Sequence, residues 1–452
     1  MLILTFNITF AQNEDITFRD IAIAITNTAM LEGKAYSMLK ELCYDIGSRL
    51  SGSPQAAAAI EWSRQTMLKY GFEDVQLQPV MVPHWVRGKI EEATIINSSI
   101  VGTVPLSISA LGGSIGTSDL GIVAEAIEVH SLKEVASLGK KAQGKIVFYN
   151  RPMDPRTMNT FAGYGGAVNQ RTLGAIEAAK VGAVAVLVRS ITTRMDHVPH
   201  TGLMLYDKNV PRIPAAAIST IDAELLSKLI KQEDKVQVRI RLDCKTYPDI
   251  QSFNVIGEIP GVETPDEIVL LGAHLDSWDA GHGAHDDGAG CVQVIEALRL
   301  LRILNLKPKR TIRAVHFMCE EFGIRGGPVY ADSVKKNGPK HIAAIEADRG
   351  GFTPWGFSVS ADSAIVEKIR RWSYLFEEIG AANIFKGGGG PDISPLNQLG
   401  TVTIGLFVDY HRYFDYHHSA NDTFDKVNER ELELGAVAMA ILSYVLAMEG
   451  VE

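Results

Sequence analysis

Short apolar strands alternate with amphipathic helices through the second half of the chain. The segments 268–273, 311–318 and 342–347 predict strands, and the segment 289–304 predicts a helix between the first two. This alternation predicts an α/β fold of three layers, with a mostly parallel central sheet and helices on both faces. In such sheets the ligand site lies beyond the carboxyl ends of the strands. The chemistry should therefore be sought where these strands end.

The alternation continues to the C-terminus. Residues 364–379 predict a helix, and residues 402–407 predict a further strand. The apolar stretch 434–448 is too short to cross a bilayer, and Asn428 and Glu431 before it have the spacing of a capping box. We therefore expect a buried C-terminal helix and no membrane partner.

A separate run of short predicted strands and helices in the middle of the chain indicates an inserted α/β domain. Short strands and helices alternate there over a segment long enough to bury its own core. Upstream, Ser53 and Pro54 have the pattern of a helix start, and the helix is expected over 55–70. The predicted parts are a leader at 1–14, the first part of the main domain at 15–118, a small α/β insertion at 119–243, and the second part of the main domain, with the site, at 244–452.

The first residues resemble the apolar core and small-residue exit of a secretory leader, although a positive start is missing. On this basis the protein is expected to be secreted, periplasmic or otherwise outside the cytoplasm. The formal net charge of -9 leaves no basic stripe, which argues against nucleic acid as a partner. Four scattered cysteines without a CxxC pair argue against a thiolate zinc site, and free, buried thiols are favoured over one disulfide.

Polar side chains follow three of the predicted strands directly. His274 and Asp276 come after the first strand, Glu320 and Glu321 after the second, and Asp348 after the third. Because the carboxyl ends of parallel strands meet at one edge of a sheet, these side chains are expected at a common rim. Their convergence is more specific than any one of the short motifs.

These residue types suit zinc, which takes imidazole nitrogen and carboxylate oxygen and leaves a position for water at catalytic sites. Asp286 opens the next helix, where a carboxylate can bridge two cations. Of the adjacent Glu320 and Glu321, one can bind metal while the other faces the substrate as general base. Asp276 is placed to orient a ligand histidine. The loop with His417 and His418 offers the last ligand.

The ordered motifs resemble metallopeptidase family twenty-eight, the co-catalytic zinc exopeptidases, and within it the plasma glutamate carboxypeptidase (carboxypeptidase Q) group. The resemblance covers nearly the whole chain after about residue 15 and implies a zinc-exopeptidase fold, with a protease-associated domain as the insertion. The motifs that carry it are His274-x-Asp276, residues 283–290, Glu320-Glu321, Asp348 and His418-Ser419.

The resemblance also implies a role for each residue and two Zn²⁺ ions per chain. His274 and Asp348 would hold one zinc, and Glu321 and His418 the other. Asp286 would bridge the two zinc ions, and its peptide bond to Asp287 would be cis. Glu320 would be the general base and Asp276 the orienting residue. The implied activity is hydrolysis of terminal peptide bonds in short peptides, and relatives are often homodimers.

Some questions stay open at the level of sequence. His417, Tyr416 and Arg349 are candidates for stabilising the oxyanion or binding substrate, and arginines near the motifs could hold a substrate carboxylate. Aminopeptidase, carboxypeptidase and dipeptidase activity are not distinguished. Two other functions compete: a single-zinc acyltransferase like glutaminyl cyclase, and a metal-free receptor. The complete ligand set disfavours both. His316, inside a predicted strand, is expected in the core.

Overall fold

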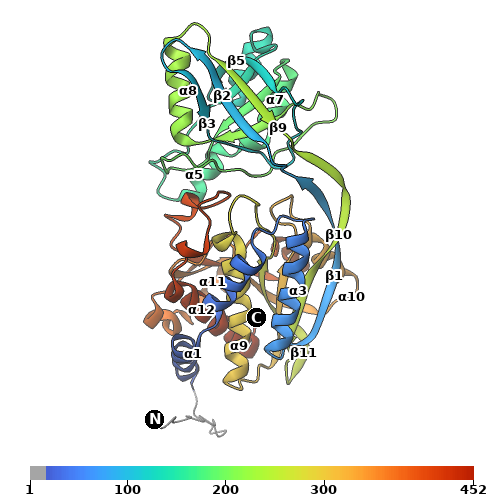
Figure 1. Ribbon diagram of the computed structural model, residues 1–452. Helices are drawn as coiled ribbons and strands as arrows, with labels where there is room; N and C mark the ends of the chain where they lie inside the picture. The colour runs from blue at the N-terminus through green and yellow to red at the C-terminus, as the bar shows by residue number, and fades with distance from the viewer. Residues whose placement is uncertain (1–16, 452) are drawn as a thin grey trace, which may run out of the picture.

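The computed structural model describes residues 17–451. The protein consists of two bodies, each built around an eight-stranded sheet (Figure 1). The expected leader at 1–14 lies outside the described residues. A two-stranded antiparallel ribbon joins the bodies: β1 (Glu73–Val86) leads up into the smaller body and β10 (Lys245–Ile259) leads back. The ribbon also forms one edge of the main sheet.

The main sheet confirms the predicted α/β fold. Its four central strands, β12, β11, β13 and β16, run parallel, and antiparallel strands flank them on both sides. In spatial order the strands after β1 and β10 are β12 (Arg310–Phe317), β11 (Thr264–His274), β13 (Lys340–Glu346), β16 (Val402–Val408), β14 (Pro354–Ser360) and β15 (Asn383–Lys386).

Helices cover both faces of this sheet because each central strand buries both of its faces. Along β11, Val269 and Leu271 belong to the large core on one face, while Ile268 and Leu270 belong to the smaller core on the other. The large core is covered by α1 (Phe18–Glu32), α2 (Ala35–Glu41), α3 (Pro54–Lys69), α9 (Ala289–Ile303), α11 (Ser363–Arg370) and α12 (Glu429–Glu449). The smaller core is covered by α10 (Gly326–Asn337) and η5 (Ser394–Leu399).

The C-terminal helix α12 begins where the sequence predicts, because the Asn428 side chain accepts a hydrogen bond from the N–H of Glu431. The helix has 21 residues, so it is longer than the apolar stretch expected to be too short for a bilayer. By length and composition it is the one helix among residues 17–451 that could span a membrane, yet 89% of its apolar window is buried inside the protein. It is the expected core helix.

The helix expected over 364–379 is divided in two. It forms α11 and then a 3-10 helix, η4 (Ser373–Ile379). Arg371 N–H already donates to the carbonyls of both Glu367 and Lys368, so the last turn tightens before Trp372. The predicted range is therefore helical at both ends, but it is not one continuous α-helix.

The smaller body is a second mixed sheet with its own core. Helices α4 (Leu132–Leu138), α7 (Gly174–Lys180) and α8 (Thr220–Gln232) pack on strands β5 to β8. Three of its strands come from before residue 119, where the insertion was expected to begin. Its strands in order are β3 (Gly102–Leu106), β2 (Glu91–Ser98), β9 (Gln237–Leu242), β5 (Ile122–Val129), β6 (Ile146–Tyr149), β7 (Ala185–Arg189), β8 (Ala215–Ile218) and β4 (Ile108–Ala110).

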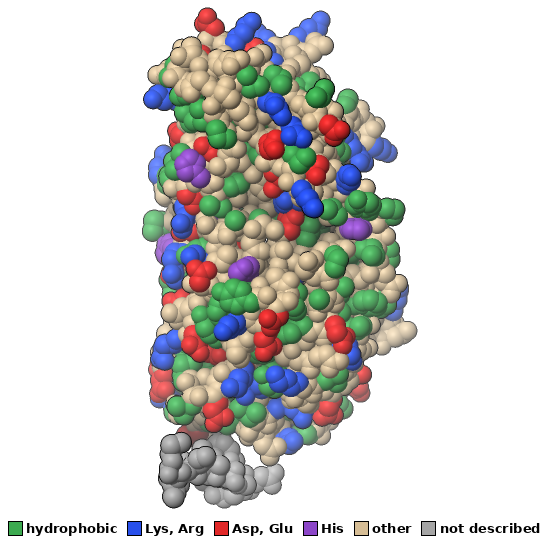
Figure 2. All heavy atoms as spheres, in the orientation of Figure 1, with side chains coloured by type: hydrophobic (Ala, Val, Ile, Leu, Met, Phe, Trp, Pro, Cys, Tyr) green, Lys and Arg blue, Asp and Glu red, His purple; other side chains and the backbone are tan. Residues whose placement is uncertain are grey.

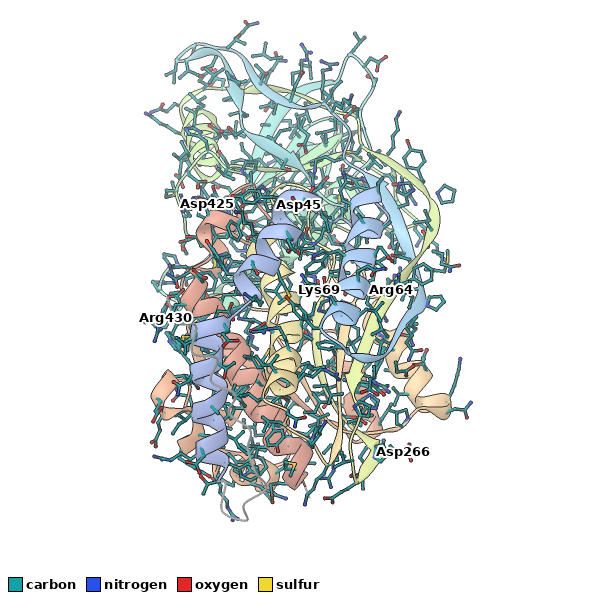
Figure 3. All side chains as sticks on the ribbon, turned by 60° about the horizontal axis from the view of Figure 1, so that its bottom comes forward. Asp45, Arg64, Lys69, Asp266, Asp425 and Arg430 are labelled. Carbon is teal, nitrogen blue, oxygen red and sulfur yellow. The ribbon has the colours of Figure 1, made fainter. Side chains whose placement is uncertain are left out.

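Charged side chains gather on the outside of the molecule. Acidic and basic groups are interspersed over the face shown in Figure 2. Figure 3 shows Arg64 and Lys69 on α3, Asp266 at the start of β11, and Asp425 and Arg430 near the start of α12. The four cysteines are all buried and unpaired, as favoured from the sequence. The buried carboxylates described below are therefore an exception that needs an explanation.

His316 lies in the core, as expected from its place in a strand. Its Nδ1 lies 2.8 Å from Ser63 Oγ and its Nε2 lies 3.0 Å from the carbonyl oxygen of Cys291. Burial lowers the pKa of His316 to about 4, only partly opposed by the bond to Cys291. The ring is therefore neutral in the folded protein at pH values where an exposed histidine carries a proton.

This histidine makes stability fall as the pH falls. Between about pH 6.5, the usual histidine pKa, and about pH 4, the unfolded chain binds a proton at His316 that the folded chain does not, a loss of about 3 kcal/mol. We expect His316→Gln to reduce the drop in the unfolding midpoint between pH 7 and pH 5, measured in urea. The exposed His411→Gln is the control, and equal drops in all three proteins would refute the assignment.

Candidate metal centre

The predicted polar residues meet at the carboxyl edge of the main sheet, below the smaller body. His274 is the last residue of β11, Glu320 and Glu321 lie just beyond β12, and Asp348 lies just beyond β13. Asp286 lies in the turn before α9. The order of strands brings these side chains together because β12, β11 and β13 are neighbours in the sheet.

One group of ligand atoms surrounds His274. Its Nε2 lies 3.3 Å from Asp286 Oδ1 and 3.4 Å from Asp348 Oδ1. Its other ring nitrogen, Nδ1, lies 3.0 Å from the main-chain oxygen of Asp276, which fixes the ring so that Nε2 faces the carboxylates. His274, Asp348 and Asp287 also have ligand atoms within 4.8 Å of one another. The oxygens of Asp287, however, accept main-chain hydrogen bonds from His274 and Gly290.

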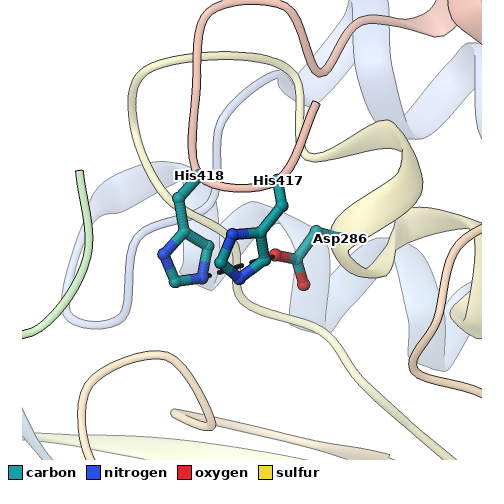
Figure 4. Close-up of side chains that lie close together, drawn as sticks. All are labelled: Asp286, His417 and His418. Atoms are coloured by element: carbon teal, nitrogen blue, oxygen red, sulfur yellow. Dashed lines mark ion pairs between the residues drawn. The ribbon is translucent and has the colours of Figure 1, made fainter. Parts of the chain in front are cut away.

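A second group surrounds His418. Its Nε2 lies 2.9 Å from Glu321 Oε2 and 3.5 Å from Asp286 Oδ2. Its Nδ1 lies 3.3 Å from the main-chain oxygen of Thr201, which belongs to the smaller body. His417 stacks on His418 with ring centroids 3.5 Å apart, and its Nε2 lies 3.9 Å from the same oxygen of Asp286 (Figure 4).

Asp286 stands between the two groups and presents a different oxygen to each histidine. Two ligands on one tetrahedral zinc, with bonds of about 2.0–2.1 Å, lie about 3.3 Å apart. The distances from Asp286 to His274 and to His418, 3.3 and 3.5 Å, have this value. The peptide bond between Asp286 and Asp287 is cis, as the resemblance implied. The donor set therefore fits a pair of cations bridged by one carboxylate.

The carboxylates of the site are buried and short of hydrogen bonds. Asp286 Oδ2 and Glu321 Oε1 have no hydrogen-bond partner. Burial and the charges of neighbouring carboxylates raise the pKa values of Glu320, Glu321 and Asp348. Buried carboxylates in this number are costly unless positive charge is supplied. A bound cation pair would supply it, and it would give the orphaned oxygens their partners.

Asp276 acts on the site through two different atoms. Its main-chain oxygen holds the His274 ring, as described above. Its carboxylate Oδ1 accepts the N–H groups of Cys319 and Glu320 at 2.8 and 3.1 Å. The side chain predicted to orient a histidine thus fixes the backbone at the end of β12. Both glutamates line a cavity, and Glu321 is the one that reaches His418.

The cavity beside the ligands has a volume of about 320 Å³ and lies between the two bodies. Glu320, Glu321, Asp286, Asp348 and both histidines of the 417–418 pair line it from the main body. The smaller body covers it, with Phe161, Tyr164, Arg171, Thr172 and Leu203. A site built in this way is closed on one side by the smaller body.

The three candidates for oxyanion or substrate contacts lie in different places. His417 lines the cavity. The ring of Tyr416 instead stacks on His285. Arg349 lies against the rings of Phe161 and Phe407. Of these candidates, His417 alone is among the residues that line the cavity.

Sequence reasoning missed four residues that shape the site. Tyr413 is buried in the cavity wall and faces Asp286, and burial raises the pKa of its hydroxyl. Asp422 accepts hydrogen bonds from the N–H groups of His285 and Asp286 and so fixes the bridging residue. Thr201 and Arg171 come from the smaller body. Tyr413 and Asp422 flank the 417–418 pair in sequence, which was the one signal that could have found them.

Comparisons with known proteins agree with this geometry. The sequence profile of Peptidase family M28 matches residues 254–445. Carboxypeptidase Q from Bos taurus is 38% identical over 433 residues, covering 95% of this chain and 89% of that protein. Carboxypeptidase Q from Homo sapiens is 38% identical over 434 residues, with coverage of 95% and 89%.

Two solved structures extend the likeness to the fold. A peptidase M28 precursor from Shewanella amazonensis has a TM-score of 0.92 and 36% sequence identity, covering 96% of this chain and 98% of that one. A zinc aminopeptidase from Bacillus subtilis has a TM-score of 0.66 and 21% identity, covering 92% and 98%, a likeness of fold alone. Both cover the smaller body as well as the main one.

Proposed function

The chain belongs to Peptidase family M28 and is a metallo-exopeptidase, and we propose that it works with two zinc ions on short peptides. The observation that carries the proposal is the position of Asp286, whose two oxygens face His274 and His418 separately. Zinc is supported by the imidazole and carboxylate donors and by the zinc named for the Bacillus subtilis aminopeptidase. In this arrangement Asp348 completes one site and Glu321 the other.

The chain's own residues then divide the work of hydrolysis. When bound, the zinc pair would lower the pKa of a water molecule and polarise the scissile carbonyl. Glu320 lines the cavity with its carboxylate and takes the proton of that water, then donates it to the leaving amine. His417 and Tyr413, both in the cavity wall, are the residues to which we assign hydrogen-bond donation to the oxyanion.

The shape of the site supports short substrates. The smaller body lies over the metal edge and is held there by the hydrogen bond from Thr201 N–H to His418 O at 2.9 Å, and by Thr160 Oγ, which donates to Tyr410 O at 2.7 Å. A cavity of about 320 Å³ under such a cover holds a peptide end and excludes a folded chain. The substrate class is therefore the termini of short peptides.

Three further properties belong to the same proposal. The smaller body takes the part of a protease-associated domain, which limits access to the site. The protein acts outside the cytoplasm, as its apolar start indicates. The protein forms a homodimer, as the family resemblance implies, and sedimentation would decide it.

Metal removal tests the two-zinc assignment directly. We expect dialysis against a chelator to abolish hydrolysis of free dipeptides, and zinc to restore it with a stoichiometry of two ions per chain, measured by elemental analysis alongside activity. The buried carboxylates around each histidine include oxygens without a hydrogen-bond partner. These carboxylates lose their protons on metal binding and become the ligands of one ion at each histidine. Full activity at one tightly bound ion would instead favour the single-zinc chemistry of a glutaminyl cyclase.

A further inference from the structure

Arg49 is a buried cation close to the ligand residues, and the proposed chemistry does not use it. The residue is 0% exposed and lies in the segment between η1 (Leu42–Ile46) and α3. All of its side-chain hydrogen bonds go to main-chain oxygens, and no carboxylate among residues 17–451 forms an ion pair with it. Burying a guanidinium charge is costly unless its N–H groups are bonded. The contacts of Arg49 therefore have to offset that cost.

The guanidinium group of Arg49 is bonded to main-chain oxygens at separate points of the main body. Its Nε donates to the main-chain oxygen of Leu275 at 2.8 Å. Its Nη1 donates to the main-chain oxygen of His282 at 2.7 Å, and its Nη2 donates to that of Gly283 at 2.9 Å. A further bond from Nη1 goes to the main-chain oxygen of Gly47 at 3.1 Å. One planar group thus bonds Leu275 and the pair 282–283 at the same time.

These bonds connect the two ends of the segment 275–283, which joins β11 to the turn that contains Asp286. The ligand His274 directly precedes this segment, and Asp286 lies three residues after it. No residue of the segment belongs to a helix or strand, so no regular hydrogen-bond ladder sets its shape. The main chain of Arg49 adds two bonds in the middle of the segment: its N–H donates to Ser277 Oγ at 3.0 Å, and its oxygen accepts the N–H of Ser277 at 3.2 Å.

The guanidinium lies directly against the backbone of Gly283. A Cβ at this residue would clash with the side chain of Ser277 and would lie 3.0 Å from Nη2 of Arg49, and the φ angle is +59°. Glycine adopts this backbone conformation without strain and leaves room for the approach. Because the contact is this close, a shift of the guanidinium would be passed on to the end of the segment that leads into Asp286.

We propose that Arg49 is a positioning residue of the metal centre, which holds the two ends of segment 275–283 together and so places His274 and Asp286 for a shared zinc ion. The inference rests on the proposed two-zinc function and adds a residue to it. His274 Nε2 lies 3.3 Å from Asp286 Oδ1, the separation of two ligands on one zinc ion, and ligands displaced by about 1 Å bind poorly. Lysine offers a point charge in place of the planar set of donors, so it cannot bond both ends of the segment at once.

The test measures the zinc affinity of the full chain by competition with a chromogenic chelator, and the unfolding midpoint of the metal-free protein in urea. We expect Arg49→Met to weaken zinc binding by about 10–100-fold, the effect typical of residues that orient metal ligands. Arg49→Lys should weaken it by a similar factor, because the geometry of the donors and not the charge is lost. Ser277→Ala is the milder variant: it removes one acceptor of Arg49 and should weaken zinc binding by about fivefold.

The matched control is a second buried arginine away from the ligands. Arg299 lies near the far end of α9 and is bonded to Glu296 and to the main-chain oxygen of Glu32. Arg299→Met should lower the unfolding midpoint of the metal-free protein and leave zinc affinity unchanged. An equal loss of zinc affinity in Arg299→Met and Arg49→Met would overturn the proposal, because the effect would then belong to any buried arginine.

Two further outcomes would contradict the role of Arg49. Wild-type zinc affinity in Arg49→Lys would show that a positive charge is sufficient. Wild-type affinity in both Arg49→Met and Ser277→Ala would show that the contacts do not act on the ligands, and Ser277→Ala decides this alone if Arg49→Met does not fold. If the wild type itself bound fewer than two zinc ions per chain, the proposed function would fall instead.

Discussion

Replacing Glu320 with glutamine is expected to lower kcat by a factor of about 10²–10⁴ while both zinc ions stay bound. Glutamine keeps the shape of the side chain and cannot accept the proton of the attacking water. Glu320 makes no ligand contact to His274 or His418, whereas its neighbour Glu321 lies 2.9 Å from His418 Nε2. The loss should therefore appear in turnover and not in metal content, which steady-state kinetics and elemental analysis measure on one sample.

The neighbouring glutamate supplies the matched comparison. Glu321→Gln changes the same chemical group one residue away, and it should lower zinc content because it weakens a ligand. Its activity loss should be reversed in part by excess zinc, while that of Glu320→Gln should not respond to zinc at all. Wild-type turnover in Glu320→Gln would remove the residue from the role of general base and leave His417 as the group to examine.

The distinction between the two glutamates shows what a sequence can and cannot predict here. The positions of His274, Glu320 and Asp348 follow from where strands end, because strand ends are local features and neighbouring parallel strands share an edge. Those residues are brought together as the pattern predicts. The α/β fold of the main body was predicted from the same periodicity and is confirmed.

The rest of the site depends on contacts between segments that no local pattern connects. Thr201 and His418 are separated by 217 positions and come from different bodies, yet they share a hydrogen bond. Arg171 enters the cavity by the same docking. The role of Asp276 also differs in atomic detail, since its main-chain oxygen and not its carboxylate lies closest to the His274 ring. Such assignments need the three-dimensional structure, because residue type alone does not say which atom of a residue makes a given contact.

Replacing Asp286 with alanine is expected to remove most binding of both zinc ions at once, and to lower activity by about 10³-fold or more. Its two oxygens face His274 and His418 at 3.3 and 3.5 Å, and no other side chain among residues 17–451 forms an ion pair with both histidines. Free zinc at 1,000 times the dissociation constant stabilises a one-site protein by about 4 kcal/mol. We therefore expect zinc to raise the melting temperature of the wild type strongly and that of Asp286→Ala hardly at all.

The metal-free forms make this prediction sharper. Without zinc, Asp286 belongs to a crowded set of buried carboxylates whose mutual repulsion and burial raise the pKa values of Glu320, Glu321 and Asp348. Removing Asp286 relieves that repulsion, but it also removes the contacts to His274 and His418 that lower the pKa of Asp286 itself. Each protein is therefore compared with its own metal-free form, so that the rise in melting temperature reports zinc binding alone. Asp425→Ala, at an exposed carboxylate that is paired with Lys426 and belongs to neither ligand group, should keep the full response to zinc. If Asp286→Ala still bound one zinc with wild-type affinity, the two sites would not share a bridge, and the two histidine groups would have to act as independent metal sites.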